Sequence, residues 1–231
     1  MLRTVLFLMV FAVCRVGFAQ ETMPISRFHP GGIFENYNVL KSDPKIKQGL
    51  YQLITRKKTA IVSGGYNNGV RVGVWHFYDQ RGKVVELYNY TTKQLLYEAP
   101  ADSTNNFIQY RFDKQVAEND SITRPVRIGG TYYGYLPYVK LFKIDASNHY
   151  AEAPLSAFME ILVSPSGQLA ECKLVVKLKL TDRVVDTYMV NNELLNPDEK
   201  TFIAATINHV PVTSTISIYC KINPDWSISL Y

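Results

Sequence analysis

The stretch "GGYNNGVRVGVWHFYDQRGK", residues 64–83, decides how the first half of this 231-residue chain folds. A phosphate-binding loop needs a strand, then glycines, and then a helix whose amide groups face the anion. Here β-branched and aromatic residues follow Gly69, and neither a Gly-Lys-Ser/Thr ending nor a G-x-G-x-x-G pattern occurs. Residues 74–78 are typical of a strand, and residues 79–82 are typical of a tight turn. The stretch therefore predicts a β-hairpin with a turn on each side.

This hairpin has a counterpart 24 residues earlier in the chain. Glycines and aromatic residues recur at that offset, in the pairs Gly49 and Gly73, Tyr51 and Trp75, and Tyr66 and Tyr90. A period this short predicts stacked hairpins, each of which is too small to bury its own apolar face. We therefore expect an N-terminal region of antiparallel β-hairpin repeats over residues 20–98.

Residues 64–90 resemble the MORN-like repeat of many bacterial proteins, in the variant with an Asn-Gly turn, Gly-x-Trp, Tyr-Asp and Gly-Lys. The matching residues are Gly69, Gly73, Trp75, Tyr78, Asp79, Gly82 and Lys83. Such repeats are architectural, and lipid or protein binding has been suggested for the wider family. Two interpretations of the aromatic residues stay open. They pack between hairpins, or they form an exposed platform for an envelope glycan or lipid, made by Trp75, Phe77 and Tyr78.

The second half begins with a polar stretch, residues 99–123, that reads as a linker with one strand at 107–112. Two further strands are expected at 157–163 and 169–178, joined by a Ser-Pro-Ser-Gly turn. Asn196 as cap and Pro197 at the first position predict a helix that runs to Ala205 or Ile207. Residues 213–222 then form a last strand. The expected order is hairpin, helix, strand, and the whole chain is expected to be α+β.

This order is similar to the C-terminal domain of TonB-like proteins, over residues 124–222 of a domain that spans 124–231. The likeness lies in a Pro…Gly-Gly entry segment, a hairpin turn and a Pro-Val step, at Pro125, Gly129, Gly130, Leu136, Pro137, Gly167, Pro211 and Val212. The Trp-x-Pro expected before the last strand is absent, and Val210 replaces the usual glycine. The resemblance implies a ββαβ domain whose partner is an outer-membrane receptor segment, with a link to TonB-dependent transport.

Partner binding in that family's manner would use an open sheet edge, whose unpaired amide and carbonyl groups can accept an extended peptide. We expect the last strand to be this edge, at Thr213, Thr215, Ser217 and Tyr219. The chain lacks TonB's Pro-rich spacer, and its N-terminal apolar segment is expected to be removed. Only the docking half of TonB's activity can therefore carry over.

Residues 1–19 have the pattern of a cleaved signal peptide. Arg3 supplies the positive start, residues 4–13 are apolar but too short to span a bilayer, and Gly17 and Ala19 are small residues before the cut. Lipidation at Cys14 is an alternative, although Val13 stands where a small residue would be expected. The prediction is a periplasmic or secreted envelope protein that does not span the membrane once the signal is removed.

Composition and motifs point away from catalysis and from nucleic acid. Without Arg3 and Arg15 the chain has 23 basic residues against 20 acidic ones, a net charge of +3, which is too mild to imply a nucleic-acid partner. None of the four histidines has metal-ligand spacing, and no nucleophile motif occurs. Cys172 and Cys220 could pair as a disulfide or remain buried thiols. We expect a non-enzymatic protein without metal or cofactor.

Overall fold

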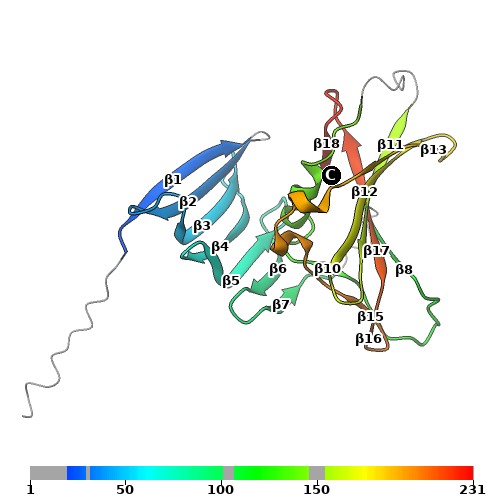
Figure 1. The fold of residues 1–231 in the computed structure, drawn as a ribbon, viewed down its shortest axis with the longest axis horizontal. Coiled ribbons are helices and arrows are strands. Elements are labelled where there is room, and N and C mark those ends of the chain that lie inside the picture. The colour runs from blue at the N-terminus through cyan, green and yellow to red at the C-terminus, as the bar shows by residue number, and fades with distance from the viewer. Residues whose placement is uncertain (1–19, 30–31, 101–106, 146–153, 231) are drawn as a thin grey trace, which may run out of the picture.

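The computed structural model describes residues 20–29, 32–100, 107–145 and 154–230. It is mostly antiparallel β-sheet, divided into two units that lie side by side (Figure 1). Across these ranges, helical structure is limited to short pieces: α1 (Leu136–Val139), η1 (Tyr133–Tyr135), η2 (Asn192–Leu194) and η3 (Pro197–Lys200). Within the described part of the chain, no helix is long and apolar enough to cross a membrane. The expected signal peptide, residues 1–19, lies outside the described residues.

The first unit is a seven-stranded antiparallel meander in which each strand pairs with the next in sequence. Its strands are β1 (Thr22–His29), β2 (Ile33–Leu40), β3 (Lys47–Thr55), β4 (Ala60–Asn67), β5 (Val70–Tyr78), β6 (Val84–Asn89) and β7 (Gln94–Glu98). The Asn-Gly turn read from the sequence joins β4 to β5. Asn68 and Gly69 have φ of 48° and 79°, the positive values that such a tight hairpin turn requires.

The hairpins β3–β4 and β5–β6 have matching backbones at an offset of 24 residues. The Thr55 amide donates to the Thr59 carbonyl at 2.8 Å, and the Asp79 amide donates to the Lys83 carbonyl at 2.9 Å. The two turns also adopt positive φ at equivalent positions, and so do the two strands that enter them. These pairs are Lys58 (64°) with Gly82 (82°), and Gly49 (80°) with Gly73 (66°).

Trp75 is the centre of the first unit's core, with no exposed surface. Tyr51 stacks on the indole at 5.4 Å between ring centroids, and Tyr66 meets it edge-on at 5.3 Å. On neighbouring β4, a Cβ at Gly64 would come within 2.2 Å of the indole ring. Glycine is therefore required there because the large ring lies directly on the backbone.

The second unit is built on a six-stranded antiparallel sheet with the order β13-β12-β11-β17-β18, in which β8 also pairs with β17. The strands are β8 (Ile108–Phe112), β11 (Leu155–Val163), β12 (Leu169–Leu178), β13 (Val184–Met189), β17 (Ser214–Ile222) and β18 (Ile228–Leu230). Two small sheets join it, made of β9 (Ile122–Thr123), β15 (Ala205–Ile207) and β16 (Val210–Val212), and of β10 (Val126–Arg127) and β14 (Phe202–Ile203).

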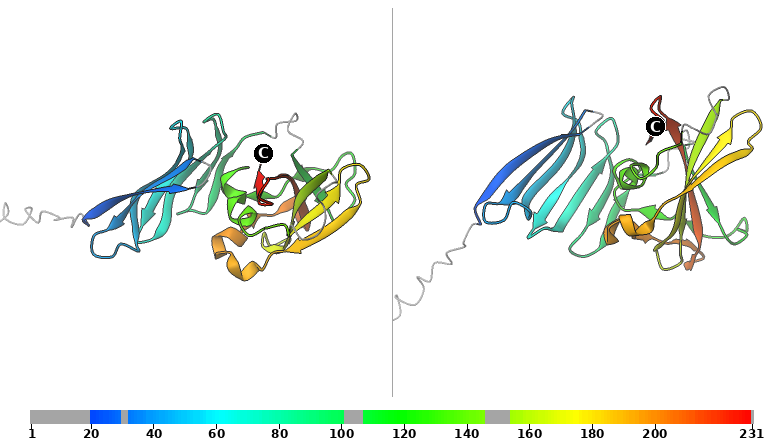
Figure 2. Two further views of the ribbon diagram at one scale, coloured as in Figure 1. Left: turned by 90° about the horizontal axis from the view of Figure 1, so that it is seen from above. Right: turned by 45° about the horizontal axis from the view of Figure 1, so that its top comes forward.

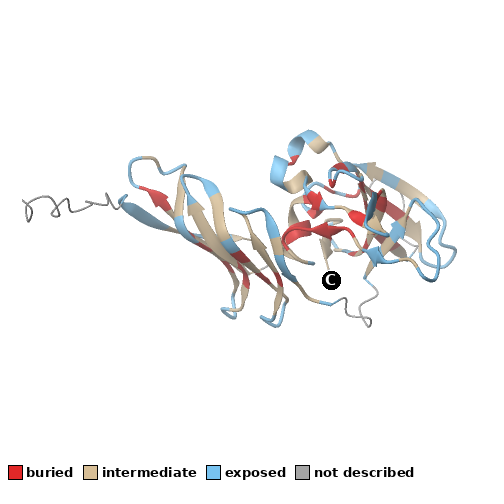
Figure 3. Cartoon of the chain, turned by 90° about the horizontal axis from the view of Figure 1, so that it is seen from below, coloured by how far each residue is buried: buried red, intermediate tan, exposed pale blue. Residues whose placement is uncertain are grey.

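The core of the second unit lies between this sheet and the segment that contains α1. Alternate residues of β11 are fully buried, as the sequence pattern predicts for one face of a strand. Tyr138 from α1 and Ile144 just after it are buried against them. Figure 2 shows α1 on the side of the sheet that faces the first unit, and Figure 3 shows the buried positions gathered there.

The helix predicted from Asn196 to Ala205 or Ile207 is wrong. Asn196 and Glu199 do form a capping box, but the helical turn ends at Lys200. Phe202 is buried in the core and lies on β14, which pairs with β10, and β15 follows directly. Pairing with distant strands therefore gives this β-branched segment a strand conformation, although the cap alone predicts a helix. The element between the hairpin and the last long strand is thus mainly β.

The polar segment predicted as a linker, residues 99–123, contributes two strands to the second unit. The strand expected there is confirmed as β8, and it pairs with β17 over five residues. β9, at the end of the segment, pairs with β15. Polarity misled the prediction because β8 exposes alternate residues and is short.

Candidate functional site

A buried carboxylate joins the two units. Glu86 of β6 is only 2% exposed, and its carboxylate oxygens accept hydrogen bonds from the Gly129 amide at 2.8 Å and the Gly130 amide at 3.0 Å. These glycines belong to the Gly-Gly entry segment singled out in the sequence. A Cβ at Gly130 would meet Val85 at 3.0 Å, and φ is positive at both glycines. The close approach of this segment to β6 therefore needs glycine.

The entry segment reaches both cores. Ile128 packs into the core of the first unit, whereas Tyr135 and Tyr138 pack into the core of the second. Tyr133 stacks on Phe77 at 5.8 Å. The two hydrogen bonds from the Gly129 and Gly130 amides to Glu86 therefore fix the region where one chain segment crosses from one core to the other.

Burial raises the pKa of Glu86 to about 7. The amides of Gly129 and Gly130 oppose this shift because they stabilise the ionised form, and Arg127 acts in the same direction. The charge of Glu98, its cross-strand neighbour on β7, raises the pKa further. Glu86 is therefore a junction carboxylate that can change charge near neutral pH.

A cleft of about 210 Å³ lies beside this junction. Arg124 and Glu98 form an ion pair on its wall at 2.5 Å, and Arg124 also donates to the Ala99 carbonyl. Arg127, 6% exposed, donates to the carbonyl of Asp198 in η3 and to that of Thr201, which directly follows η3. The Arg124 contacts therefore join the second unit to the end of β7 in the first, whereas the Arg127 contacts lie within the second unit. Both oxygens of Glu86 accept hydrogen bonds from amides, and the carboxylate of Glu98 is paired with Arg124.

The predicted aromatic platform is wrong for two of its three residues. Trp75 and Phe77 have no exposed surface, because both are on the face of β5 that forms the core. Tyr78 is on the opposite face, where it stacks with His76 and its hydroxyl lies 3.3 Å from the Ser63 hydroxyl. The packing interpretation left open in the sequence analysis is therefore the correct one for Trp75 and Phe77.

The same core contains a repeated contact between a cation and an aromatic ring, which the sequence analysis missed. The Lys47 ammonium lies 4.7 Å from the Tyr51 ring, and the Arg71 guanidinium lies 5.0 Å from the Trp75 ring. Each pair is 24 residues from the other, the offset already seen in the glycines and aromatics. The two cations stand at this spacing in the sequence, where Lys47 and Arg71 are 24 residues apart. They cover the aromatic core.

Cys172 and Cys220 are free and buried, so the disulfide alternative is not realised. They lie on β12 and β17, which flank β11 on opposite sides. Strands separated by a third strand are roughly 9–10 Å apart, beyond the Cα separation that a disulfide spans. Burial raises the pKa of Cys172 to about 12 and of Cys220 to about 11, so both thiols stay protonated at neutral pH.

The prediction that the last strand is an open edge is wrong. β17 carries Thr215, Ser217 and Tyr219, and Thr213 directly precedes it. One side of β17 pairs with β11, and the other side pairs first with β8 and then with β18. The segment read as a linker supplies β8, which closes the expected edge. Peptide addition at β17 therefore has no free backbone to use.

Within the ranges that the structure describes, no strand pairs with the outer side of β1, which is the outermost strand of the first unit and therefore an open edge. β1 pairs with β2 in continuous register over eight residues, and Figure 3 shows most of it as exposed. The Lys41 amide donates to the Glu21 carbonyl, so backbone groups at alternate positions from Glu21 face β2. The backbone groups of the intervening residues point to the open side; these residues are Thr22, Pro24, Ser26 and Phe28.

Among the described residues, no cluster of three or more His, Cys, Asp or Glu side chains could hold a metal ion. His29 instead lies 2.9 Å from a carboxylate oxygen of Glu35, which also binds Lys47. His149 lies outside the described residues.

No family model, curated protein or solved structure matches this chain.

Proposed function

We propose that this chain is a non-enzymatic cell-envelope protein that binds a protein partner by adding a strand of that partner to the open edge of β1. The observation that carries the proposal is the uncovered, eight-residue ladder of β1, the outermost strand of its sheet. An extended peptide gains main-chain hydrogen bonds at such an edge, and its alternate side chains set specificity.

Several features of β1 suit this role. Phe28 is 57% exposed and Met23 is 38% exposed, so a bound peptide would find apolar surface on both faces of the strand. Pro24 has no amide hydrogen, and its position on the open side removes one donor from the edge. Proline at that position is a known means of limiting unselective edge pairing. A partner must therefore match a defined pattern of donors and acceptors.

The resemblances of the sequence support the envelope setting. The signal-like residues 1–19 favour export, and the likeness to TonB C-terminal domains makes an extended segment of an outer-membrane receptor the natural partner. We place the docking edge on β1 because β17 is paired on both sides.

The test compares two substitutions at one position. Ser26→Pro removes an outward amide, and Ser26→Ala keeps that amide while losing the same side-chain hydrogen bond to Asn36. The mature chain, residues 20–231, is used to capture partners from the native envelope, and binding is then measured with the purified partner. Loss of one edge hydrogen bond should weaken binding by about fivefold for Ser26→Pro relative to Ser26→Ala.

Circular dichroism of both variants checks that the sheet is intact. Hydrogen exchange should also slow at the outward amides of Thr22, Ser26 and Phe28 when the partner is present. Equal affinity of the two variants, or unchanged exchange along β1, would disprove docking at this edge.

A further inference from the structure

The hairpin between β12 and β13 ends in an unusually exposed apolar tip. Leu180 is 86% exposed, and Val184, at the start of β13, is 51% exposed. The turn is tight, because the Leu178 amide donates to the Arg183 carbonyl at 3.0 Å and the Asp182 amide donates to the Leu178 carbonyl at 2.9 Å. Leu180 is thus held away from the body of the protein by a short, hydrogen-bonded turn.

Basic side chains surround this leucine. Residues 177–183 contain three basic residues, Lys177, Lys179 and Arg183, and one acidic residue, Asp182. Lys177 forms an ion pair with Asp182 at 3.5 Å, which leaves Lys179 and Arg183, both exposed, on either side of Leu180. The turn therefore combines one exposed aliphatic side chain with three basic residues and one acidic residue, Asp182, whose carboxylate pairs with Lys177.

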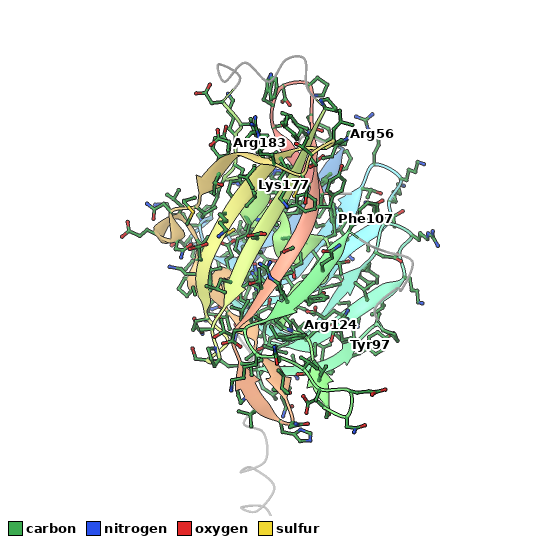
Figure 4. The ribbon with its side chains drawn as sticks, turned by 90° about the vertical axis from the view of Figure 1, so that its right-hand side faces the viewer. Arg56, Tyr97, Phe107, Arg124, Lys177 and Arg183 are labelled. Atoms are coloured by element: carbon green, nitrogen blue, oxygen red, sulfur yellow. The ribbon has the colours of Figure 1, made fainter. Side chains whose placement is uncertain are left out.

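The first unit carries basic turns on the upper side of the molecule, although Figure 1 places this unit at the other end of the long axis from the β12–β13 hairpin. Figure 4 shows Lys177 and Arg183 near the upper end, together with Arg56 of the β3–β4 turn. Two more exposed cations lie in that turn and two in the equivalent β5–β6 turn: Lys57, Lys58, Arg81 and Lys83. The one acidic residue of these two turns, Asp79, already accepts hydrogen bonds from the Arg81 and Lys83 amides.

We propose that the tip of the β12–β13 hairpin docks on an anionic phospholipid surface, with Leu180 inserted among the acyl chains and Lys179 and Arg183 at the headgroups. Insertion of apolar side chains combined with basic residues near an anionic leaflet is the physical basis of peripheral membrane binding. The charge of the tip selects an anionic surface over a neutral one. A bilayer also accepts a single protruding leucine without a preformed pocket, which a protein partner would have to supply.

The experiment measures co-sedimentation of residues 20–231 with vesicles of phosphatidylglycerol and phosphatidylethanolamine, against vesicles of phosphatidylcholine alone. The chain should sediment with the anionic vesicles only. Leu180→Ser should weaken partitioning by about tenfold, since the leucine loses its apolar environment. The single variants Lys179→Gln and Arg183→Gln should each weaken partitioning onto the anionic vesicles by about fivefold. Added salt should also weaken partitioning of the wild type.

Leu194 provides a matched control. It is 66% exposed, but it lies next to Glu193 and close in sequence to Asp198 and Glu199. Leu194→Ser should leave partitioning unchanged. A direct readout of insertion comes from Leu180→Trp, whose fluorescence should be quenched by brominated acyl chains, whereas Leu194→Trp should not respond.

Equal sedimentation of Leu180→Ser and wild type would overturn the proposal, and so would equal binding to phosphatidylcholine. Absence of quenching in Leu180→Trp would exclude insertion. None of these variants touches β1, so failure here leaves partner docking at β1 unaffected.

Discussion

At the scale of single residues, Trp75 shows how strongly one side chain constrains its surroundings. Its ring lies against the backbone of β4 at Gly64, and its indole nitrogen donates to the Gly65 carbonyl at 3.2 Å. Tyrosines surround the ring and Arg71 covers it. A residue with no exposed surface and this many contacts stabilises the fold and is closed to any ligand.

Trp75→Ala should therefore lower the free energy of unfolding by about 3–5 kcal/mol, because it leaves a large cavity in the first core. Chemical denaturation of residues 20–231 measures this loss. Val74→Ala, on the opposite and more exposed face of the same strand, is the control and should cost less than about 1 kcal/mol. A Trp75→Ala variant as stable as the control would mean that the indole does not hold this core together.

At the scale of elements, the two hairpins of the first unit use different residues for one backbone conformation. Gly82 adopts positive φ in the β5–β6 turn at little cost, whereas Lys58 adopts it in the β3–β4 turn against the preference of a residue with a side chain. The turn hydrogen bonds are equivalent, so the strain at Lys58 comes from the residue type alone.

We expect Lys58→Gly to stabilise the protein by about 0.5–1 kcal/mol, because relief of the left-handed conformation exceeds the added flexibility of the unfolded chain. Gly82→Ala should destabilise it by about 1 kcal/mol, and its Cβ would also lie 3.1 Å from Thr59. Thermal unfolding of the two variants gives both signs. Two changes of the same sign would show that the turns are not energetically equivalent.

At the scale of the whole molecule, Glu86 ties the entry segment to the first sheet, and its charge state should affect the stability of the chain. The folded protein holds the proton of this carboxyl up to its pKa of about 7, whereas the unfolded chain releases it near the ordinary value of 4.5. The extra stability is fully present below pH 4.5, and it is lost as the pH rises through 7.

The unfolding free energy should therefore fall by about 3 kcal/mol through Glu86 between pH 4.5 and pH 8. Other groups also titrate. Burial raises the pKa of Glu35, but its hydrogen bonds with Lys47 and His29 outweigh burial, and the net pKa is lowered. The contribution of Glu35 to the pH dependence of stability therefore has the opposite sign. Denaturation of Glu86→Gln over the same pH range measures the pH dependence due to these other groups, because they remain in the variant. Parallel pH profiles of the variant and the wild type would show that Glu86 does not titrate in this window.

The sequence by itself determined the local β structure. Asn68-Gly69, Asp79-Gly82 and the strand-forming residues between them specify hairpins through φ preferences and side-chain shape, which act over a few residues. Glycine and aromatic residues recur at an offset of 24 residues, and the structure has positive φ angles at the same offset in the two hairpins. The helix after Asn196 failed because a cap specifies where a helix can begin, while pairing with β10 decided how the chain continued.

Only the tertiary structure decided which surfaces remain open. Trp75 could be a platform or a core residue until its neighbours were placed, and β17 could be an edge until β8, more than one hundred residues earlier, paired with it. The exposure of β1 and of Leu180 was equally invisible in the sequence, as was the meeting of Glu86 with Gly129 and Gly130. The physical reason is that burial and strand pairing depend on long-range contacts, which no local propensity encodes.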